Sequence, residues 1–356
     1  MPKRLEIPMK KTTTKLDKIG SVLKDVKLSF EVLTISSVNP LEGESIVVQV
    51  LGAQKKYGEI EMSDGRMSKM REGDIIAGVL GERKALEGIV GVIPKKVNCG
   101  DVLNILNLGG VIGTAVSWNK DFVSSPVKVK VLGSILANKK TLNIHNFSLK
   151  PEMKLNSKIP IITVIGTAMG VGKTTVATEL IHTLVKQKGL KVSAAKLTGV
   201  ATQRDILAMK DVGALSTLTF HDVGLTSTLN NHDGVVIATK TILNTLSKDK
   251  PEIIVVELGD GIIGWYGVEK LLNDKEFIHS ISFTIVCAHD LVGAVGAKDI
   301  LEKKGIQCNF FAGPVANNTA GTDYLEKILK IPSADIRDDK SKLLKVLEKK
   351  GVIKHD

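Results

Sequence analysis

A glycine-rich turn followed by a lysine and two threonines is the part of this 356-residue chain best suited to chemistry. Phosphates are held in proteins by backbone N–H groups, by a helix N-terminus and by a lysine. Here Lys173 supplies the charge, and the Thr174 hydroxyl is placed to bind a bridging Mg²⁺. The turn follows an apolar run and therefore predicts a phosphate-binding loop. The residues expected around the phosphates are Gly166, Thr167, Ala168, Met169, Gly170, Val171, Gly172, Lys173, Thr174 and Thr175.

Polar residues that follow other apolar runs could complete this site. Glu257 ends such a run, and a carboxylate in that position is the usual second anchor for Mg²⁺, with Asp260 as an alternative. Lys196 interrupts a run of small, apolar residues. We expect its ammonium to meet a phosphate or an acyl-phosphate-like transition state, the alternative being a surface salt bridge. Asp205 either binds the metal or caps the following helix.

The second half of the chain alternates strand-like and helix-like stretches, which predicts a mainly parallel sheet covered on both faces. Ligands of such a sheet bind at the carboxyl ends of its strands. Predicted strands cover residues 161–165, 191–195, 218–220, 253–258, 283–288 and 309–312, and predicted helices cover residues 174–188, 228–246, 292–304 and 322–329.

Two segments rich in Thr, Ser and Asn, residues 198–204 and 222–231, extend from the same predicted edge. We expect them to form the pocket for a small-molecule acid substrate. His221 and Asp222 are adjacent in the chain, so their side chains point apart and should line the pocket rather than act as a dyad.

The first half is β-rich and predicts a small barrel or sandwich, because short β-branched runs there are separated by turns. Gly109-Gly110 lacks a basic partner, so a tight turn is expected there rather than a second phosphate loop. A polar connection at residues 146–158 gives two domains, 1–150 and 151–356. The runs begin at Ser29, Ser45, Asp74, Gly88, Asp101 and Val127.

Composition narrows the classes of protein to which this chain could belong. No apolar run is long enough to span a membrane, and the first residues lack the apolar segment of a secretory signal, so a cytoplasmic location is expected. The net charge is +11, but aromatic residues make up only 4% and the lysines are dispersed, so a nucleic-acid site is not expected. Cys287 and Cys308 lie in strand-like runs and predict buried thiols rather than a disulfide or a zinc site.

The loop from Gly166 to Thr175 resembles that of dethiobiotin synthetase and the cobyrinic acid amide synthetases, within a P-loop class that includes MinD-like ATPases. The similarity covers residues 159–329. It also rests on Lys196, on the segment that begins with Asp205, on Val256-Glu257-Leu-Gly-Asp-Gly261 and on Val315-Ala316-Asn317.

This resemblance implies ATP and Mg²⁺ as cofactors and a homodimer as the assembly. It implies that Lys173 and Lys196 contact the transferred phosphate and that Asn317 binds the base. Thr174, Asp205 and Glu257 would hold the metal. The expected activity is ATP-dependent activation of a carboxylate or carbamate by phosphoryl transfer.

Two other functions remain open. The segments around Lys196, Arg204 and His221 are also similar to a P-loop group that includes proteins assigned as D-glutamate N-acetyltransferases, which implies a loop that binds coenzyme A phosphates. A nucleotide-dependent switch that engages a partner protein is the third possibility. Ala168 and Met169 stand where MinD-like proteins have a second lysine.

Overall fold

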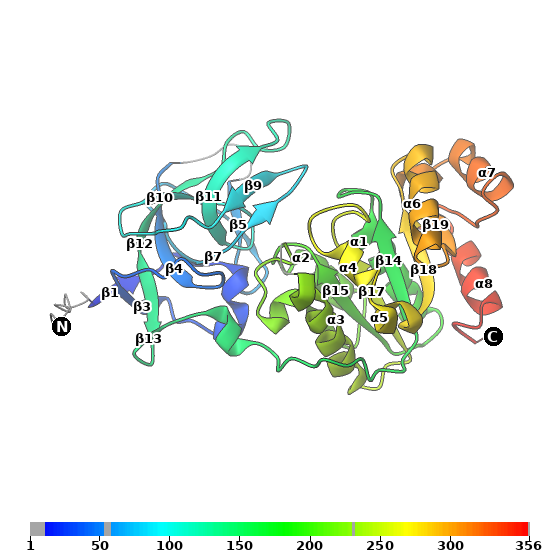
Figure 1. Cartoon of the computed structure of the whole chain (residues 1–356), viewed down its shortest axis with the longest axis horizontal. Helices are drawn as coiled ribbons and strands as arrows, with labels where there is room; N and C mark the ends of the chain where they lie inside the picture. Colours follow the sequence, from blue (N-terminus) through cyan, green and yellow to red (C-terminus); the bar gives the residue numbers. More distant parts are fainter. Residues whose placement is uncertain (1–10, 53–57, 230–231, 355–356) are drawn as a thin grey trace. The chain divides into compact units, whose positions relative to one another are not determined.

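The computed structural model describes residues 11–52, 58–229 and 232–354. The chain forms two compact units (Figure 1). The main division follows Ser148, close to residue 150, but two short segments of the second half belong to the first unit. The first unit is Met1–Ser148 with Val200–Gln203 and Gly224–Ser227; the second is Leu149–Gly199, Arg204–Val223 and Thr228–Asp356.

The first unit is built from short strands and two 3-10 helices. These elements are β1 (Lys11–Lys15), β2 (Lys18–Ile19), η1 (Ser21–Val26), β3 (Glu31–Ile35), β4 (Ser45–Val50), β5 (Glu59–Glu61), β6 (Met67–Lys69), β7 (Ile75–Leu80), β8 (Arg83–Lys84), β9 (Ile89–Val92), β10 (Val102–Ile105), β11 (Val111–Trp118), β12 (Lys128–Ala137), β13 (Lys140–Thr141) and η2 (Ile144–Phe147).

A ring of strands in this unit closes into a barrel. β12 pairs with β4, β4 with β7, β7 with β11 and β11 with β10, and β10 pairs back with β12. All these pairings are antiparallel except that of β7 with β11, which is parallel. Closure pairs both edges of every strand in the ring, so the unit is a barrel rather than a sandwich.

Alternate residues of the barrel strands form its core, as the two-residue period of a strand requires. On β4 these are Ile46, Val48 and Val50, and on β12 they are Val129 and Val131. The predicted turn before β11 is present, since the Gly110 N–H donates to the Asn107 carbonyl and Gly110 has a φ of 94°. β11 itself, which begins directly after this turn, is not among the predicted strands.

The second unit contains a six-stranded parallel sheet in the order β16-β15-β17-β14-β18-β19. Its strands are β14 (Ile161–Gly166), β15 (Val192–Thr198), β16 (Thr217–Thr219), β17 (Ile253–Leu258), β18 (Ile281–Cys287) and β19 (Phe310–Ala312). Its helices are α1 (Lys173–Lys186), α2 (Arg204–Asp211), η3 (Phe220–Val223), α3 (His232–Ser247), α4 (Val268–Leu271), α5 (Lys275–Ser280), α6 (Leu291–Lys303), η4 (Pro314–Ala316), α7 (Thr319–Lys327) and α8 (Ser341–Lys349).

Helices cover both faces of this sheet (Figure 1). Ile254, Val256 and Leu258 of β17 pack on one face with apolar residues of α3 to α7. Ile253 and Val255 pack on the other face with α1, α2 and α8. The predicted α/β class is therefore correct, and every predicted strand of this half is present, with its ends shifted by up to three residues.

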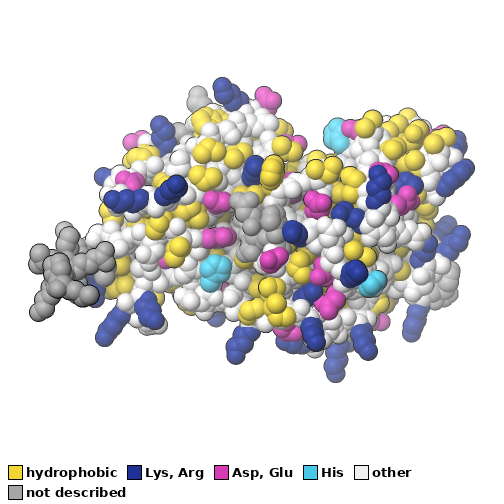
Figure 2. All heavy atoms as spheres, in the orientation of Figure 1, with side chains coloured by type: hydrophobic (Ala, Val, Ile, Leu, Met, Phe, Trp, Pro, Cys, Tyr) yellow, Lys and Arg dark blue, Asp and Glu magenta, His cyan; other side chains and the backbone are white. Residues whose placement is uncertain are grey.

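The described part of the chain contains no helix with the length and apolar character needed to span a lipid bilayer. Figure 2 shows Lys and Arg side chains spread over the visible face, with Asp and Glu side chains among them. A dispersed basic surface of this kind favours solubility and attracts small anions.

Candidate functional site

The loop that is predicted to bind phosphate lies between β14 and α1, so it has the strand-turn-helix setting that the sequence predicts. β14 ends at Gly166 and α1 begins at Lys173, so six residues form the turn. Gly170 and Gly172 have φ values of 71° and 84°, in the left-handed region that glycine adopts without strain. The first turn of α1 points its N–H groups into the loop, as the start of any helix does. This geometry suits an anionic phosphate group.

Lys173 lies on the inner side of this loop. Its residue is only 6% exposed, and its Nζ donates a hydrogen bond of 2.6 Å to the carbonyl oxygen of Ala168. Burial lowers the pKa of Lys173, although the negative charge of Glu257 opposes this effect. The carbonyl oxygen of Ala168 and a phosphate oxygen are both hydrogen-bond acceptors. The Lys173 ammonium can therefore exchange the carbonyl for a phosphate oxygen that enters the loop.

Strand alternation places Lys196 and Glu257 on the same face of the sheet. Lys196 lies two residues after Ala194, and Glu257 two after Val255, both of which face α1 and α2. The two residues are in register on β15 and β17, which are neighbouring strands. The helices on this face start with Lys173 on α1 and with Arg204-Asp205 on α2, so four predicted site residues share one end of one face.

Lys196 forms ion pairs with both carboxylates predicted to bind metal. Its Nζ pairs with Asp205 Oδ2 and lies 3.7 Å from Glu257 Oε1. The three side chains are largely buried, with exposures of 13% for Lys196, 20% for Asp205 and 2% for Glu257. Lys196 therefore forms a salt bridge, as the alternative expectation has it, but a largely buried one rather than one on the surface.

The ion pair between Lys196 and Asp205 keeps both side chains charged. Burial by itself lowers the pKa of Lys196, but the Glu257 and Asp205 carboxylates outweigh it and raise the pKa above its usual value. Burial likewise tends to raise the pKa of Asp205, but Lys196 outweighs it and lowers the pKa. Both groups are ionised at neutral pH.

Glu257 has a free acceptor that suits a cation. Its Oε2 is buried and has no hydrogen-bond partner among the residues that the structure describes. A buried carboxylate oxygen without a partner is costly, and Mg²⁺ takes oxygen ligands from one or two carboxylates together with substrate phosphates. The carboxylates of Glu257 and Asp205 and the hydroxyl of Thr174 are oxygen ligands of the kind that Mg²⁺ takes. No three His, Cys, Asp or Glu side chains in the described ranges are grouped to hold a metal on their own.

Asp260, the alternative metal ligand, is engaged in its own loop. It has a φ of 69°, and its carboxylate accepts backbone hydrogen bonds from Trp265 and Gly261. Burial raises the pKa of Asp260, and Lys173 opposes this effect. Asp260 therefore shapes the turn after β17, which favours Glu257 as the metal ligand.

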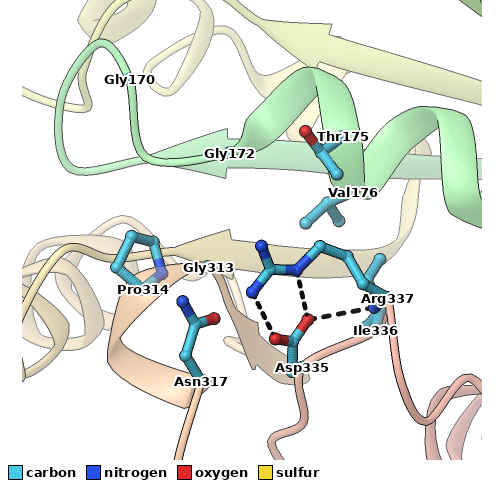
Figure 3. Close-up of a pocket in the computed structure, with 10 residues that line it drawn as sticks. All are labelled: Gly170, Gly172, Thr175, Val176, Gly313, Pro314, Asn317, Asp335, Ile336 and Arg337. Carbon is cyan, nitrogen blue, oxygen red and sulfur yellow. Dashed lines mark hydrogen bonds and ion pairs between the residues drawn. The ribbon is translucent and has the colours of Figure 1, made fainter.

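A pocket of about 170 Å³ opens beside the phosphate-binding loop. Figure 3 shows Asn317 and Arg337 projecting into the space between the loop and the segment that carries Asp335. Arg337 Nε and Nη2 both bond the Asp335 carboxylate. The pocket is lined by Gly170, Gly172, Thr175, Val176, Gly313, Pro314, Asn317, Asp335, Ile336 and Arg337.

Asp335 and Arg337 line this pocket but are not among the predicted site residues. Their segment follows Ser333, which pairs in parallel with Phe311 at the edge of the sheet. One bridging residue is too short to produce an alternating pattern, so no strand signal marks this segment.

The segments expected to form the acceptor pocket use several of their hydroxyls internally. Thr198 Oγ1 donates to the Gly259 carbonyl at 2.8 Å and Thr228 Oγ1 to the Tyr266 carbonyl at 2.8 Å. Thr226 Oγ1 donates to Glu42 Oε1 at 2.5 Å, and all three threonines are fully buried. These three hydroxyls hold the backbone in place and are not available to a substrate, while the formation of an acceptor pocket by the two segments stays a prediction. Residues 230–231 of the second segment lie outside the described residues.

Comparison with known proteins gives only partial structural likenesses. No protein-family model and no curated protein sequence matches the chain. Among solved structures, the signal recognition particle receptor FtsY from Elizabethkingia anophelis is 14% identical over 49% of this chain and 57% of that chain, with a TM-score of 0.35. A DUF1611 family protein from Anabaena variabilis is 13% identical over 60% and 65%, with a TM-score of 0.39.

The hydrogenase maturation factor HypB from Archaeoglobus fulgidus is 12% identical over 55% of this chain and 90% of that chain, with a TM-score of 0.35. The match to FtsY spans little more than half of the length of the FtsY chain. Likenesses of this size say nothing about what this chain binds.

Proposed function

We propose that the second unit binds ATP with Mg²⁺ and transfers the γ-phosphoryl group to a carboxylate or carbamate of a small acid. A carboxylate oxygen attacks the γ-phosphorus, the bond to the bridging oxygen breaks, and ADP leaves. The product is an acyl phosphate, from which a nucleophile displaces phosphate. The observation that carries this proposal is a second largely buried lysine, Lys196. It lies on the face of the sheet that is covered by α1, the helix that begins with Lys173.

Two lysines are more than phosphate binding requires. Lys173 and the start of α1 suffice to hold the β- and γ-phosphates. A further ammonium, fixed by Asp205 and Glu257, costs no reorganisation when negative charge develops on the transferring group. Lys196 is therefore the residue we assign to transition-state stabilisation.

Side-chain oxygens of Glu257, Asp205 and Thr174 would bind the metal ion. When bound, Mg²⁺ neutralises the phosphate oxygens and orients them for in-line transfer. Lys196 neutralises part of the negative charge of the two carboxylates, which lets them lie close to the same ammonium in the absence of a metal ion.

Hydroxylamine trapping tests the proposed reaction. The full chain is incubated with ATP, Mg²⁺, a panel of small carboxylic acids and hydroxylamine, which converts an acyl phosphate into a hydroxamate. The proposal predicts hydroxamate and ADP in equal amounts for at least one acid. Release of free coenzyme A from acetyl coenzyme A, with no ADP formed, would instead support the N-acyltransferase function.

A nucleotide-dependent switch is the second candidate function, and the chain path favours it. Val200–Gln203 follows the strand that carries Lys196, and it belongs to the β-rich unit. A change at the nucleotide could therefore pass along the chain into that unit. ATP-dependent protection of barrel amides from hydrogen exchange, without product from any acid, would favour the switch.

A further inference from the structure

Two short segments from the second half of the chain are integrated into the β-rich unit, and one of them joins two elements of the proposed phosphoryl-transfer site. Val200–Gln203 connects β15, which carries Lys196, to α2, which begins with Arg204-Asp205. Gly224–Ser227 lies farther along the chain, after η3. The two segments pair with each other, since the Ala201 N–H donates to the Thr226 carbonyl at 2.8 Å.

The β-rich unit binds the first of these segments through buried polar contacts. Asn107 is 2% exposed, and its Nδ2 donates to the Ala201 carbonyl at 2.8 Å. Gly109 lies directly against the same carbonyl, because a Cβ at this position would be only 2.2 Å from the oxygen. The Gly109-Gly110 turn therefore has a structural purpose: it lets the backbone of Ala201 approach the barrel.

Glu61 makes the contact nearest to the site. It is the last residue of β5, is 1% exposed, and accepts a hydrogen bond of 2.7 Å from the backbone N–H of Gln203. The same oxygen, Oε2, accepts a second hydrogen bond from the Ser21 hydroxyl. Gln203 also donates through its side chain to the Ser63 carbonyl at 3.1 Å. A buried carboxylate requires such donors, so this arrangement fixes the backbone at Gln203.

We infer that Glu61 is a positioning residue for the phosphoryl-transfer site. By binding the N–H of Gln203, it fixes the residue that precedes α2, and so fixes the Asp205 carboxylate, two residues later, against Lys196. The effect on turnover rests on the proposed function, whereas the anchoring of Gln203 does not. Glu61 and Gln203 both belong to the β-rich unit, so the inferred effect on Asp205 passes only along the chain from Gln203 into α2.

Hydrogen exchange of the full chain, read by mass spectrometry, tests the anchoring. In Glu61→Ala, the amides of residues 203–207 should exchange at least about 10-fold faster than in the wild type, because the acceptor is gone. Glu61→Gln keeps an acceptor oxygen and should lie between the two. Glu59→Ala is the matched control, since Glu59 is exposed on the same strand. Unchanged exchange at residues 203–207 in Glu61→Ala would overturn the inference.

Turnover measured on the same variants tests the positioning role. Glu61→Ala should lower kcat by about 10- to 100-fold, because a small misplacement of a catalytic group is enough for such a loss. Its Kd for ATP should stay within about twofold of the wild type, since the phosphate-binding loop is untouched. Partial recovery of kcat in Glu61→Gln would support positioning, and an unchanged kcat in Glu61→Ala would exclude it.

Two further results remain decisive. If Glu61→Ala does not fold, Asn107→Ala removes the neighbouring bond to the Ala201 carbonyl and is predicted to speed exchange of the same amides. A wild-type chain that binds no nucleotide would overturn the proposed function and with it the turnover effect. The exchange result would still decide whether Glu61 anchors Gln203.

Discussion

Lys196 and Glu257 are in register on neighbouring parallel strands, with Lys196 Nζ 3.7 Å from Glu257 Oε1. Asp205 pairs with the same ammonium. The cluster therefore contains one buried carboxylate, one largely buried carboxylate and one largely buried cation. Its net negative charge suits the proposed binding of Mg²⁺, and an ammonium already paired with two carboxylates suits the proposed stabilisation of a transferring phosphoryl group.

Replacing Lys196 with Met should destabilise the protein more at pH 8 than at pH 5. Without the ammonium, burial and the neighbouring Glu257 carboxylate raise the folded-state pKa of Asp205 above its unfolded value of about 4. A group with a raised pKa contributes its full stability below its unfolded pKa and loses it as the pH rises through its folded pKa. We expect a loss of about 3–5 kcal/mol at pH 8 and less at pH 5.

Thermal or urea unfolding at the two pH values measures this difference. Lys186→Met is the matched control, because Lys186 is exposed at the end of α1. It should change the free energy of unfolding by less than about 0.5 kcal/mol at either pH. If Lys196→Met lowered the free energy of unfolding equally at pH 5 and pH 8, the ion pairs of Lys196 with Asp205 and Glu257 would not contribute to stability as described.

The same Lys196→Met substitution should separate catalysis from binding. We predict that kcat falls by about 100- to 1,000-fold, as for the loss of one preorganised electrostatic group. The Kd for ATP should change by less than about threefold, because Lys173 and the loop remain. Single-turnover kinetics and equilibrium titration measure the two quantities, and equal losses in both would remove Lys196 from the transition state.

Asn317→Ala should weaken ATP binding by about 10-fold, the equivalent of one hydrogen bond, without changing kcat. Asn317 lines the pocket beside the loop, at the position that the family resemblance assigns to base recognition. Asn156→Ala, at an exposed asparagine, is the control. A titration in which both variants bind ATP like the wild type would place the base elsewhere.

The three cysteines should differ sharply in reactivity. Burial raises the pKa of Cys287 to about 12 and also raises the pKa of Cys308, so both are protonated and shielded at neutral pH. Cys99 is exposed, although burial of its thiol raises its pKa too. Titration with a disulfide reagent at pH 8 should modify one thiol in the folded chain and three after denaturation. More than one rapidly reacting thiol in the folded chain would show that the core around Cys287 or Cys308 is open.

Local patterns predicted much of the second unit. The glycines before Lys173 predict the turn between β14 and α1, and the alternation of strands and helices predicts the parallel sheet. The two-residue alternation of side chains along a strand also explains why Lys196 and Glu257 lie on one face of the sheet. Lys196 lies two residues after the buried Ala194, and Glu257 lies two residues after the buried Val255.

The missing parts depend on contacts between distant residues. Barrel closure requires β10 to pair with both β11 and β12, which no single stretch of sequence specifies. The hydroxyl of Thr226 looks like a ligand-binding group until its partner, Glu42, is brought beside it by folding. Likewise, Glu61 and Gln203 are separated by more than a hundred residues, so the anchoring of α2 has no local signature.

The most direct test of the proposed function is calorimetric titration of ATP, with Mg²⁺ present, into the wild type, Lys173→Ala and the control Lys186→Ala. The account predicts 1:1 binding to the wild type and to Lys186→Ala. It predicts at least about 100-fold weaker binding to Lys173→Ala, because a charge-assisted contact to the phosphates is lost. Circular dichroism should show that all three chains are folded. Equal affinity of the wild type and Lys173→Ala for ATP would contradict a phosphate-binding role for this loop.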